Sequence, residues 1–155
     1  MKGITMNKKV IYLAGPWFTD RQDEILQETK LTLDSVPVKY YSPKDEMLFT
    51  PGGPTDPIAV LNSNTTAIKD ADILVCVTDG KDTGTMFEAG YACALDKPIF
   101  YLWVDHERGQ KFNLMLGASG IICMSFDELA SQITEYFISG THLIPTLVRE
   151  GIIYE

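Results

Sequence analysis

Residues 72–104 read DILVCVTDGKDTGTMFEAGYACALDKPIFYLWV, and this stretch decides the fold class. The runs at 72–78 and 98–104 are almost continuously apolar rather than alternating, which is typical of strands buried on both faces of a sheet. Between them, residues 80–84 have turn composition and residues 85–95 have the composition of a helix rich in small side chains. A strand, a helix and a second buried strand in this order predict neighbouring parallel strands.

The flanking segments repeat this alternation. Upstream, an apolar run predicts a strand at 10–15, and Thr19 with Gln22 three residues later forms a capping box that opens a helix. The other expected elements are a strand at 36–41, a helix that begins at Asp56 and Pro57, a strand at 121–124 and a helix at 126–138. Five such strands predict one doubly wound α/β domain over residues 1–155, with a five-stranded parallel sheet in the flavodoxin-like order 2-1-3-4-5.

Composition narrows the classes of partner. The chain has 155 residues, 45% of them apolar, and a formal net charge of -8. Acidic residues exceed basic ones and no Lys/Arg cluster occurs, so we expect neither nucleic acid nor an anionic membrane as a partner. No apolar run is long enough to span a bilayer and no signal-peptide core precedes the first strand, so we expect a cytoplasmic protein. The three cysteines are expected to be reduced core thiols.

Ligands of such sheets bind beyond the carboxyl ends of the strands, where the strand order reverses. Gly15, Trp17 and Phe18 follow the first strand. The two aromatic rings could stack on a flat ligand, or they could pack on the first helix.

Asp82 and Glu88 follow the third strand, in the turn and in the helix after it. Burial among apolar residues raises the pKa of a carboxyl group, whereas a helix N-terminus favours the anion. An ionised but poorly hydrated carboxylate suits nucleophilic attack on an anomeric carbon. The alternative is a surface glutamate in the first turn of a helix.

Two asparagines and the C-terminal segment complete the candidates. Asn113 lies among apolar residues and is either a partly buried amide with a fixed role or a capping residue. Asn64 lies within the second helix, where asparagine is slightly disfavoured. The tail at 139–155 stays apolar through Tyr154, so we expect it to dock on its own domain or on a neighbour, whereas residues 1–8 are expected to be flexible.

Taken together, these stretches resemble the nucleoside 2-deoxyribosyltransferase family. The resemblance runs in order along nearly the whole chain. It is carried by Tyr12, by residues 15–20 with Gln22, by DTGTMFEAGYA at 82–92, by 113–115 and by 150–154.

The resemblance implies transfer of 2-deoxyribose from one nucleobase to another through a covalent ester on Glu88, with retention at the anomeric carbon. Glu88 then matches the family's nucleophile and Tyr12 the tyrosine that positions it. Asp82 matches a group that holds the sugar hydroxyls. The substrates implied are a deoxyribonucleoside and a free nucleobase, with no metal and no cofactor.

The resemblance also implies a shared site. Asn113 matches a second group on the sugar, Tyr154 matches the tyrosine of the tail, and Trp17 and Phe18 match the aromatic wall beside the nucleoside. In this family Asn113 and the tail come from a neighbouring subunit. We therefore expect residues 139–155 to dock on a neighbour in a homo-oligomer, either a dimer or a tetramer or hexamer built from dimers.

Three positions depart from the family pattern. Asn64 stands where many members have an aspartate that serves the base, and Met47 stands where a glutamine reads the base. Glu155 follows Tyr154, so the tyrosine is penultimate in this sequence. The sugar-handling residues are kept and the base-handling residues are altered, so base preference cannot be carried over.

Three alternatives remain at this point. Water could take the sugar ester, which would make the protein an N-glycoside hydrolase. A nucleotide N-glycosidase is less well supported, because Asp82 would repel a 5′-phosphate. A non-catalytic sensor of nucleosides would not need a glutamate at position 88.

Overall fold

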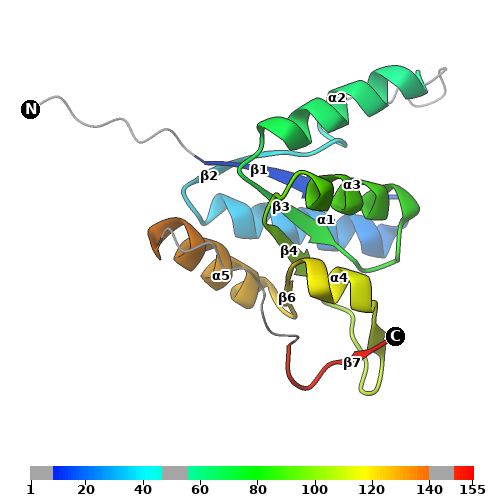
Figure 1. Ribbon diagram of the computed structural model, residues 1–155, viewed down its shortest axis with the longest axis vertical. Helices are drawn as coiled ribbons and strands as arrows, with labels where there is room; N and C mark the ends of the chain where they lie inside the picture. Colours follow the sequence, from blue (N-terminus) through cyan, green and yellow to red (C-terminus); the bar gives the residue numbers. More distant parts are fainter. Residues whose placement is uncertain (1–8, 47–55, 140–148) are drawn as a thin grey trace, which may run out of the picture.

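The computed structural model describes residues 9–46, 56–139 and 149–155 (Figure 1). A parallel sheet has the order β2-β1-β3-β4-β6. Its strands are β1 (Lys9–Ala14), β2 (Val38–Tyr41), β3 (Ile73–Val77), β4 (Ile99–Leu102) and β6 (Ile121–Cys123). Since β6 is the last of the five strands expected, the predicted α/β class and the order 2-1-3-4-5 are confirmed. Residues 1–8, for which flexibility was expected, lie outside the described residues.

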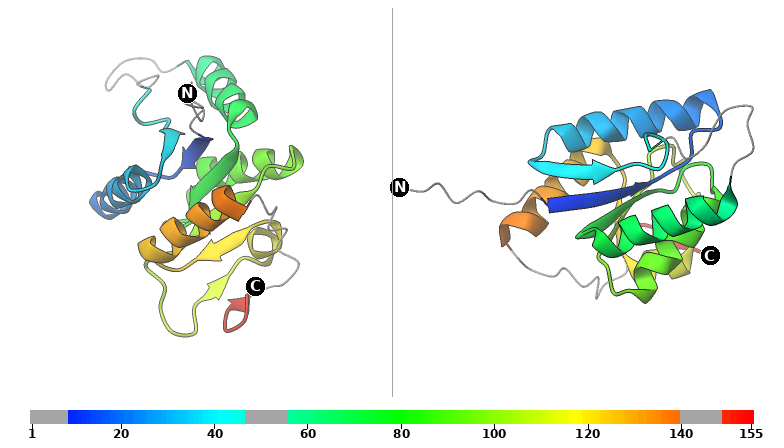
Figure 2. Two further views of the ribbon diagram at one scale, coloured as in Figure 1. Left: turned by 90° about the vertical axis from the view of Figure 1, so that its left-hand side faces the viewer. Right: turned by 90° about the horizontal axis from the view of Figure 1, so that it is seen from above.

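Helices cover both faces of this sheet (Figures 1 and 2). The helices α1 (Asp20–Asp34) and α5 (Phe126–Ser139) pack on one face, and α2 (Pro57–Asp70) and α3 (Thr83–Ala94) pack on the other. Both predicted helix starts are confirmed: Thr19 and Gln22 form the capping box of α1, and Asp56 caps α2 with Pro57 at the first helical position. These caps satisfy backbone N–H groups that have no partner within the helix.

The alternation of side chains along β1 divides the core into two layers. Ile11 and Leu13 face α1 and α5, whereas Tyr12 and Ala14 face α2 and α3. All four side chains are fully buried. Because Tyr12 is the polar member of this set, its hydroxyl needs a partner on the α2/α3 face.

Two short elements that the sequence pattern did not indicate lie between β4 and β6. A two-residue strand β5 (Lys111–Phe112) and a short helix α4 (Leu114–Ser119) form there. A second two-residue strand, β7 (Ile153–Tyr154), pairs with β5 in parallel. Elements this short carry no measurable hydrophobic period, which is why the sequence pattern did not indicate them.

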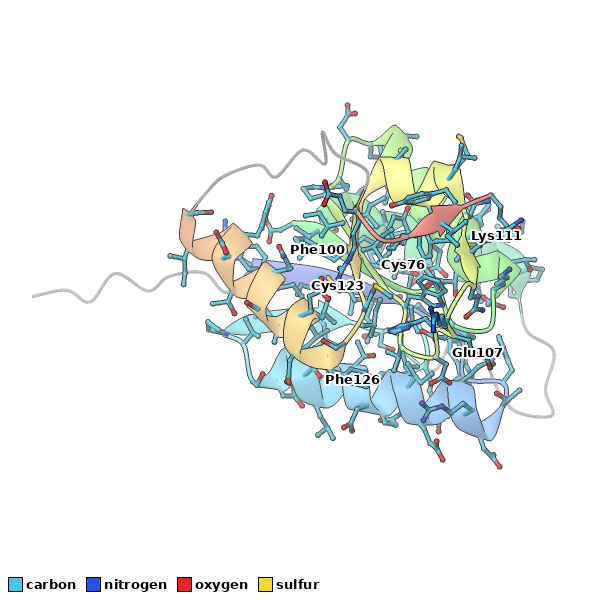
Figure 3. The ribbon with its side chains drawn as sticks, turned by 90° about the horizontal axis from the view of Figure 1, so that it is seen from below. Cys76, Phe100, Glu107, Lys111, Cys123 and Phe126 are labelled. Carbon is cyan, nitrogen blue, oxygen red and sulfur yellow. The ribbon has the colours of Figure 1, made fainter. Side chains whose placement is uncertain are left out.

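Residues 149–155 of the tail contact their own chain. The Arg149 guanidinium donates to the carbonyl of Ile122 and forms an ion pair with Glu128. The Glu155 N–H donates to the Phe112 carbonyl at 3.0 Å, and the Leu114 N–H donates to the main-chain oxygen of Glu155 at 2.9 Å. Figure 3 shows Lys111 beside this C-terminal strand. Docking of the tail on a neighbouring subunit concerns an assembly and stays a prediction.

Three expectations about burial were wrong. Cys76 and Cys123 are buried free thiols, but Cys93 is exposed on α3. The helical spacing of Ile58 and Leu61 predicts that both side chains face the core, yet they are 64% and 43% exposed. Ile58 and Leu61 lie in the first half of α2, which extends beyond the sheet (Figure 1).

Within the described ranges, no helix combines the length and the apolar character needed to cross a bilayer.

Gly120, which links α4 to β6, provides a test of the packing at this edge. A Cβ atom there would lie 2.5 Å from the carbonyl oxygen of Ile99 and 2.6 Å from the Tyr101 ring. We expect Gly120→Ala to lower the free energy of unfolding by about 1–3 kcal/mol, as overpacked cores do. Urea denaturation measures this change.

Gly90→Ala is the matched control, because a Cβ atom on this exposed glycine of α3 meets nothing within 4 Å. It should be neutral or stabilise the protein by about 0.5–1 kcal/mol, since alanine is the better helix former. Equal destabilisation by both substitutions would contradict this packing.

Candidate functional site

The site is built around a contact between strand β1 and helix α3. The Tyr12 hydroxyl donates a hydrogen bond to the Oε2 atom of Glu88. Tyr12 is fully buried, and Glu88 lies in the second turn of α3 with part of its surface open to solvent. The strand supplies a rigid donor and the helix supplies the carboxylate, so the position of one Glu88 oxygen is set by the core.

Burial dominates the ionisation of this pair. It raises the pKa of Glu88 from 4.5 to about 7, against the lowering effect of the Tyr12 hydrogen bond, and the nearby charge of Asp82 adds to the rise. The pKa of Tyr12 is raised as well, chiefly by burial and then by the charge of Glu88. Tyr12 therefore keeps its proton and acts as the donor, and Glu88 changes charge near neutral pH.

The helix begins two residues earlier than expected, and this changes the electrostatics of Glu88. With α3 starting at Thr83, Glu88 is the sixth residue of the helix and lies beyond its first turn. The favourable effect of a helix N-terminus on an anion fades within that turn. Desolvation therefore prevails, which agrees with the raised pKa.

Asp82 is the N-cap of α3. Its Oδ2 atom accepts from the Thr85 N–H at 2.8 Å and from the Thr85 hydroxyl at 2.9 Å. Asp82 is half-buried and close enough to raise the pKa of Glu88. Asp82 at the N-cap and Glu88 in the second turn therefore lie close together on the helix that follows β3.

Tyr41 joins this cluster and was missed in the sequence. Its ring stacks on that of Tyr12, with ring centroids 5.4 Å apart and an interplanar angle of 18°. Its hydroxyl contacts the Ser63 hydroxyl at 3.1 Å and donates to the Asn64 Oδ1 atom at 3.3 Å. The cluster thus runs from Glu88 through two tyrosines to Asn64. The alternation of the strand at 36–41 could have suggested that Tyr40 and Tyr41 face opposite sides, but not which one meets Tyr12.

The residues that follow β1 are arranged differently. A Cβ atom on Gly15 would lie 3.1 Å from Val77 and 3.2 Å from Leu26, so this glycine allows close packing of β3 and α1. Trp17 packs against the core on the α1/α5 face, which agrees with the packing alternative for this ring. Phe18 is 69% exposed, and its ring lies 5.1 Å from that of Trp17. Stacking of either ring on a ligand stays a prediction.

Asn113 and Tyr154 lie on the β5, α4 and β7 unit rather than beside Glu88 in the same chain. Asn113 is exposed and caps α4, accepting from the N–H groups of Met115 and Leu116, which agrees with the capping alternative and not with a partly buried amide. The Tyr154 ring packs against Gly117, and its hydroxyl donates to the Arg149 carbonyl at 3.4 Å. Met47 lies outside the described residues.

A pocket of about 330 Å³ opens beside this unit. Met86, Trp103 and Phe112 contribute its apolar wall, and Asn113 and Glu155 lie at its polar side. Lys81 and Lys111 also line it, each with its ammonium 3.9 Å from the Glu155 carboxylate. Among the residues that the structure describes, no three His, Cys, Asp or Glu side chains are grouped so that they could hold a metal ion.

The comparisons with known proteins agree on one family. Residues 11–115 match the family model described as Nucleoside 2-deoxyribosyltransferase. The chain is 30% identical to a nucleoside deoxyribosyltransferase of Lactobacillus leichmannii over 125 residues, which covers 71% of this chain and 80% of that protein.

Two solved structures are similar in fold. One is the 2-deoxyribosyltransferase of Bacillus psychrosaccharolyticus, with a TM-score of 0.68 and 25% identity, covering 78% of this chain and 90% of the other. The second is a CMP N-glycosidase of Clostridium botulinum, with a TM-score of 0.56 and 17% identity, covering 81% of this chain and 98% of the other. At that identity the second likeness shows the fold alone.

The raised pKa of Glu88 predicts a pH-dependent gain in stability for Glu88→Gln. The folded state favours the protonated carboxyl group, so the stability that Glu88 contributes is complete below about pH 4.5 and is lost as the pH rises through about 7. Glutamine stays neutral and can still accept the Tyr12 hydrogen bond. The variant should therefore gain stability relative to the wild type between pH 5 and pH 8, by on the order of 2 kcal/mol.

Chemical denaturation at several pH values measures this difference. Glu135→Gln, at an exposed position on α5, is the matched control and should show much less dependence on pH. A difference between Glu88→Gln and the wild type that stays constant from pH 5 to pH 8 would show that Glu88 ionises normally.

Proposed function

The chain belongs to the nucleoside 2-deoxyribosyltransferase family, and on that basis we propose that it transfers 2-deoxyribose between nucleobases with Glu88 as the nucleophile. The observation that carries the proposal is the Tyr12–Glu88 contact. It holds a partly desolvated carboxylate on α3, the helix that follows β3, and ligands of such sheets bind near the loops that follow the strands.

The chemistry takes two displacements. In the first, a Glu88 oxygen attacks the anomeric carbon, the carbon–nitrogen bond breaks and the base departs with its electron pair. In the second, a ring nitrogen of the incoming base attacks the same carbon and loses its proton to water, and the ester bond breaks, which returns the carboxylate. Two inversions give net retention. Tyr12 donates to one Glu88 oxygen and so directs the other towards the sugar.

The remaining roles are assigned by the family pattern. Asp82 and Asn113 hold the sugar hydroxyls, while Trp17 and Phe18 form an aromatic wall beside the nucleoside. Neither displacement needs a metal or an organic cofactor. In the first, the carboxylate is the nucleophile and the base is the leaving group, and in the second these roles are reversed.

The nearest rival is hydrolysis of the same ester by water. The CMP N-glycosidase of similar fold suggests that such a hydrolase could act on nucleotides. Against it stands the carboxylate of Asp82, next to Glu88, which repels a phosphate. Lys81, the residue before Asp82, has its ammonium beside Glu155. A purely sensory domain has no use for a carboxylate that is held for attack.

We also propose that the enzyme is a homo-oligomer with shared active sites. Asn113 and Tyr154 share one structural unit, so a neighbour would receive them together. Exposed apolar side chains adjoin Asn113 on this unit: Leu114, Met115 and Ile153 are 55%, 72% and 52% exposed. Exposed apolar clusters of this kind mark interaction surfaces.

A product assay tests the proposed reaction. The protein is incubated with thymidine or deoxyinosine, with and without adenine as acceptor, and the products are separated by chromatography. Deoxyadenosine should form only when adenine is present, and the 5′-monophosphate donors should react much more slowly. Glu88→Ala should lose more than about 10³-fold of the rate, because the covalent route is gone.

Mass spectrometry of the wild type with donor alone should show one added deoxyribosyl group, which Glu88→Ala lacks. Free deoxyribose formed at the same rate with and without adenine would establish the hydrolase instead. Equal use of thymidine and its 5′-monophosphate would establish a nucleotide enzyme. Binding of a nucleoside without any turnover would support the alternative of a non-catalytic sensor.

Subunit mixing tests the shared site. We expect deletion of residues 152–155 to abolish most activity while the fold remains. Mixed one to one with Glu88→Ala under subunit exchange, the deleted chain should recover about a quarter of wild-type activity, since half of the dimers are mixed and one of their two sites is intact.

The matched control carries both changes in one chain. Mixed with Glu88→Ala, it contributes no intact Glu88 and should restore nothing. A monomer in analytical ultracentrifugation that is still active would contradict shared sites. So would a first mixture that recovers no activity although its subunits are shown to exchange.

A further inference from the structure

Tyr41 contacts both Tyr12 on β1 and Asn64 on α2. In the parallel register of β1 and β2, it is the partner of Tyr12. The two rings stack on the α2/α3 face at 5.4 Å. A buried ring held against another ring on a paired strand has little freedom to turn, so Tyr41 limits the motion of the phenol that holds Glu88.

At its other end, Tyr41 is bonded to helix α2. Its hydroxyl lies 3.1 Å from the Ser63 Oγ atom and 3.3 Å from the Asn64 Oδ1 atom. A phenol has one proton, and Oδ1 can only accept. Tyr41 therefore donates to Asn64, and the Ser63 hydroxyl donates to Tyr41.

Under the proposed function, Asn64 stands at the family position that serves the base, so this arrangement determines what Asn64 can offer to a base. Its carbonyl oxygen is engaged by Tyr41, and its NH₂ group has no acceptor among the residues that the structure describes. Asn64 is half-buried, so this donor is partly shielded from water. A fixed and partly desolvated NH₂ group suits an acceptor atom of a ligand rather than a donor.

We propose that Tyr41 is the positioning residue that fixes the Asn64 amide as a hydrogen-bond donor to the departing base, and that the enzyme thereby prefers oxo bases over amino bases. The proposal rests on the proposed function. It adds the substrate class, namely nucleosides whose base carries a carbonyl oxygen next to a ring N–H.

The preference for oxo bases follows from where the electron pair and the proton go in the first displacement. When the carbon–nitrogen bond breaks, its electron pair passes to the base. Asn64 has no proton to give, so the base leaves as an anion that the NH₂ group stabilises and that water later protonates. A ring carbonyl delocalises this negative charge. Amino bases form a poorer anion and depend more on protonation during departure.

The test compares Tyr41→Phe with Tyr40→Phe. Tyr41→Phe removes the hydroxyl and keeps a ring to stack on Tyr12. Tyr40 is the matched control, because it is the preceding residue of β2, is also half-buried and packs on the opposite face. The rates compared are those of deoxyinosine against deoxyadenosine and of thymidine against deoxycytidine, each with one common acceptor base.

We expect the wild type and Tyr40→Phe to favour the oxo member of each pair. Tyr41→Phe should reduce the oxo-to-amino ratio of kcat about tenfold, the value of one hydrogen bond to a charged group. Its pH dependence should keep the midpoint set by Glu88, because the stack on Tyr12 remains. An unchanged ratio in Tyr41→Phe, or an equal fall in Tyr40→Phe, would overturn the proposal.

A second measurement does not depend on activity. The side-chain NH₂ resonances of Asn64 in a ¹⁵N-labelled sample are assigned by their loss in Asn64→Asp. They should shift in Tyr41→Phe and stay in place in Tyr40→Phe. Unshifted resonances in Tyr41→Phe would refute the orienting contact even in an active enzyme. If the resonances shift but the protein has no transferase activity, the contact between Tyr41 and Asn64 is supported and the proposed function is wrong.

Discussion

A phenol hydroxyl in the core must be hydrogen-bonded, and most of the site follows from that requirement at Tyr12. The central strand β1 buries the Tyr12 ring on the face covered by α2 and α3. The free energy lost by an unpaired hydroxyl there would be several times that of an ordinary hydrogen bond. Glu88 on α3 accepts the bond and is itself drawn out of water, which raises its pKa. The same contact thus satisfies the buried hydroxyl and influences the ionisation of the carboxylate, so neither residue can change without affecting the other.

The main sheet was predictable because its strands are long apolar runs and its helix starts carry specific side chains. The run at 72–78 and the capping box at Thr19 and Gln22 each have a direct physical cause, and the structure agrees with both. The pairing of β5 with β7 was not predictable, since two residues define no period and the pairing depends on contacts across the whole chain. Ile58 and Leu61 show a related limit. Helical spacing identifies an apolar face, but not whether this chain supplies a surface to cover it.

Part of the candidate site was predictable from the sequence as well. Glu88 and Tyr12 stood out through the family pattern, and the structure brings them into contact. The sequence did not reveal whether desolvation or the helix N-terminus has the larger effect on the pKa of Glu88, because this depends on where α3 begins. A start at Thr83 instead of Thr85 moves the carboxyl group out of the first turn. Tyr41 could not be found at all without the register of β1 and β2, since a sequence does not say which residues of two parallel strands stand side by side.

The pairing of β5 with β7 has a consequence for how the molecule moves. It joins residues 111–112 to 153–154, far apart in the sequence, through a ladder only two residues long. Such a ladder can open while the five-stranded sheet stays closed, so we expect residues 153–155 to have low local stability. Their backbone amides should exchange with deuterium long before those of β1 or β3, through local opening that does not require global unfolding.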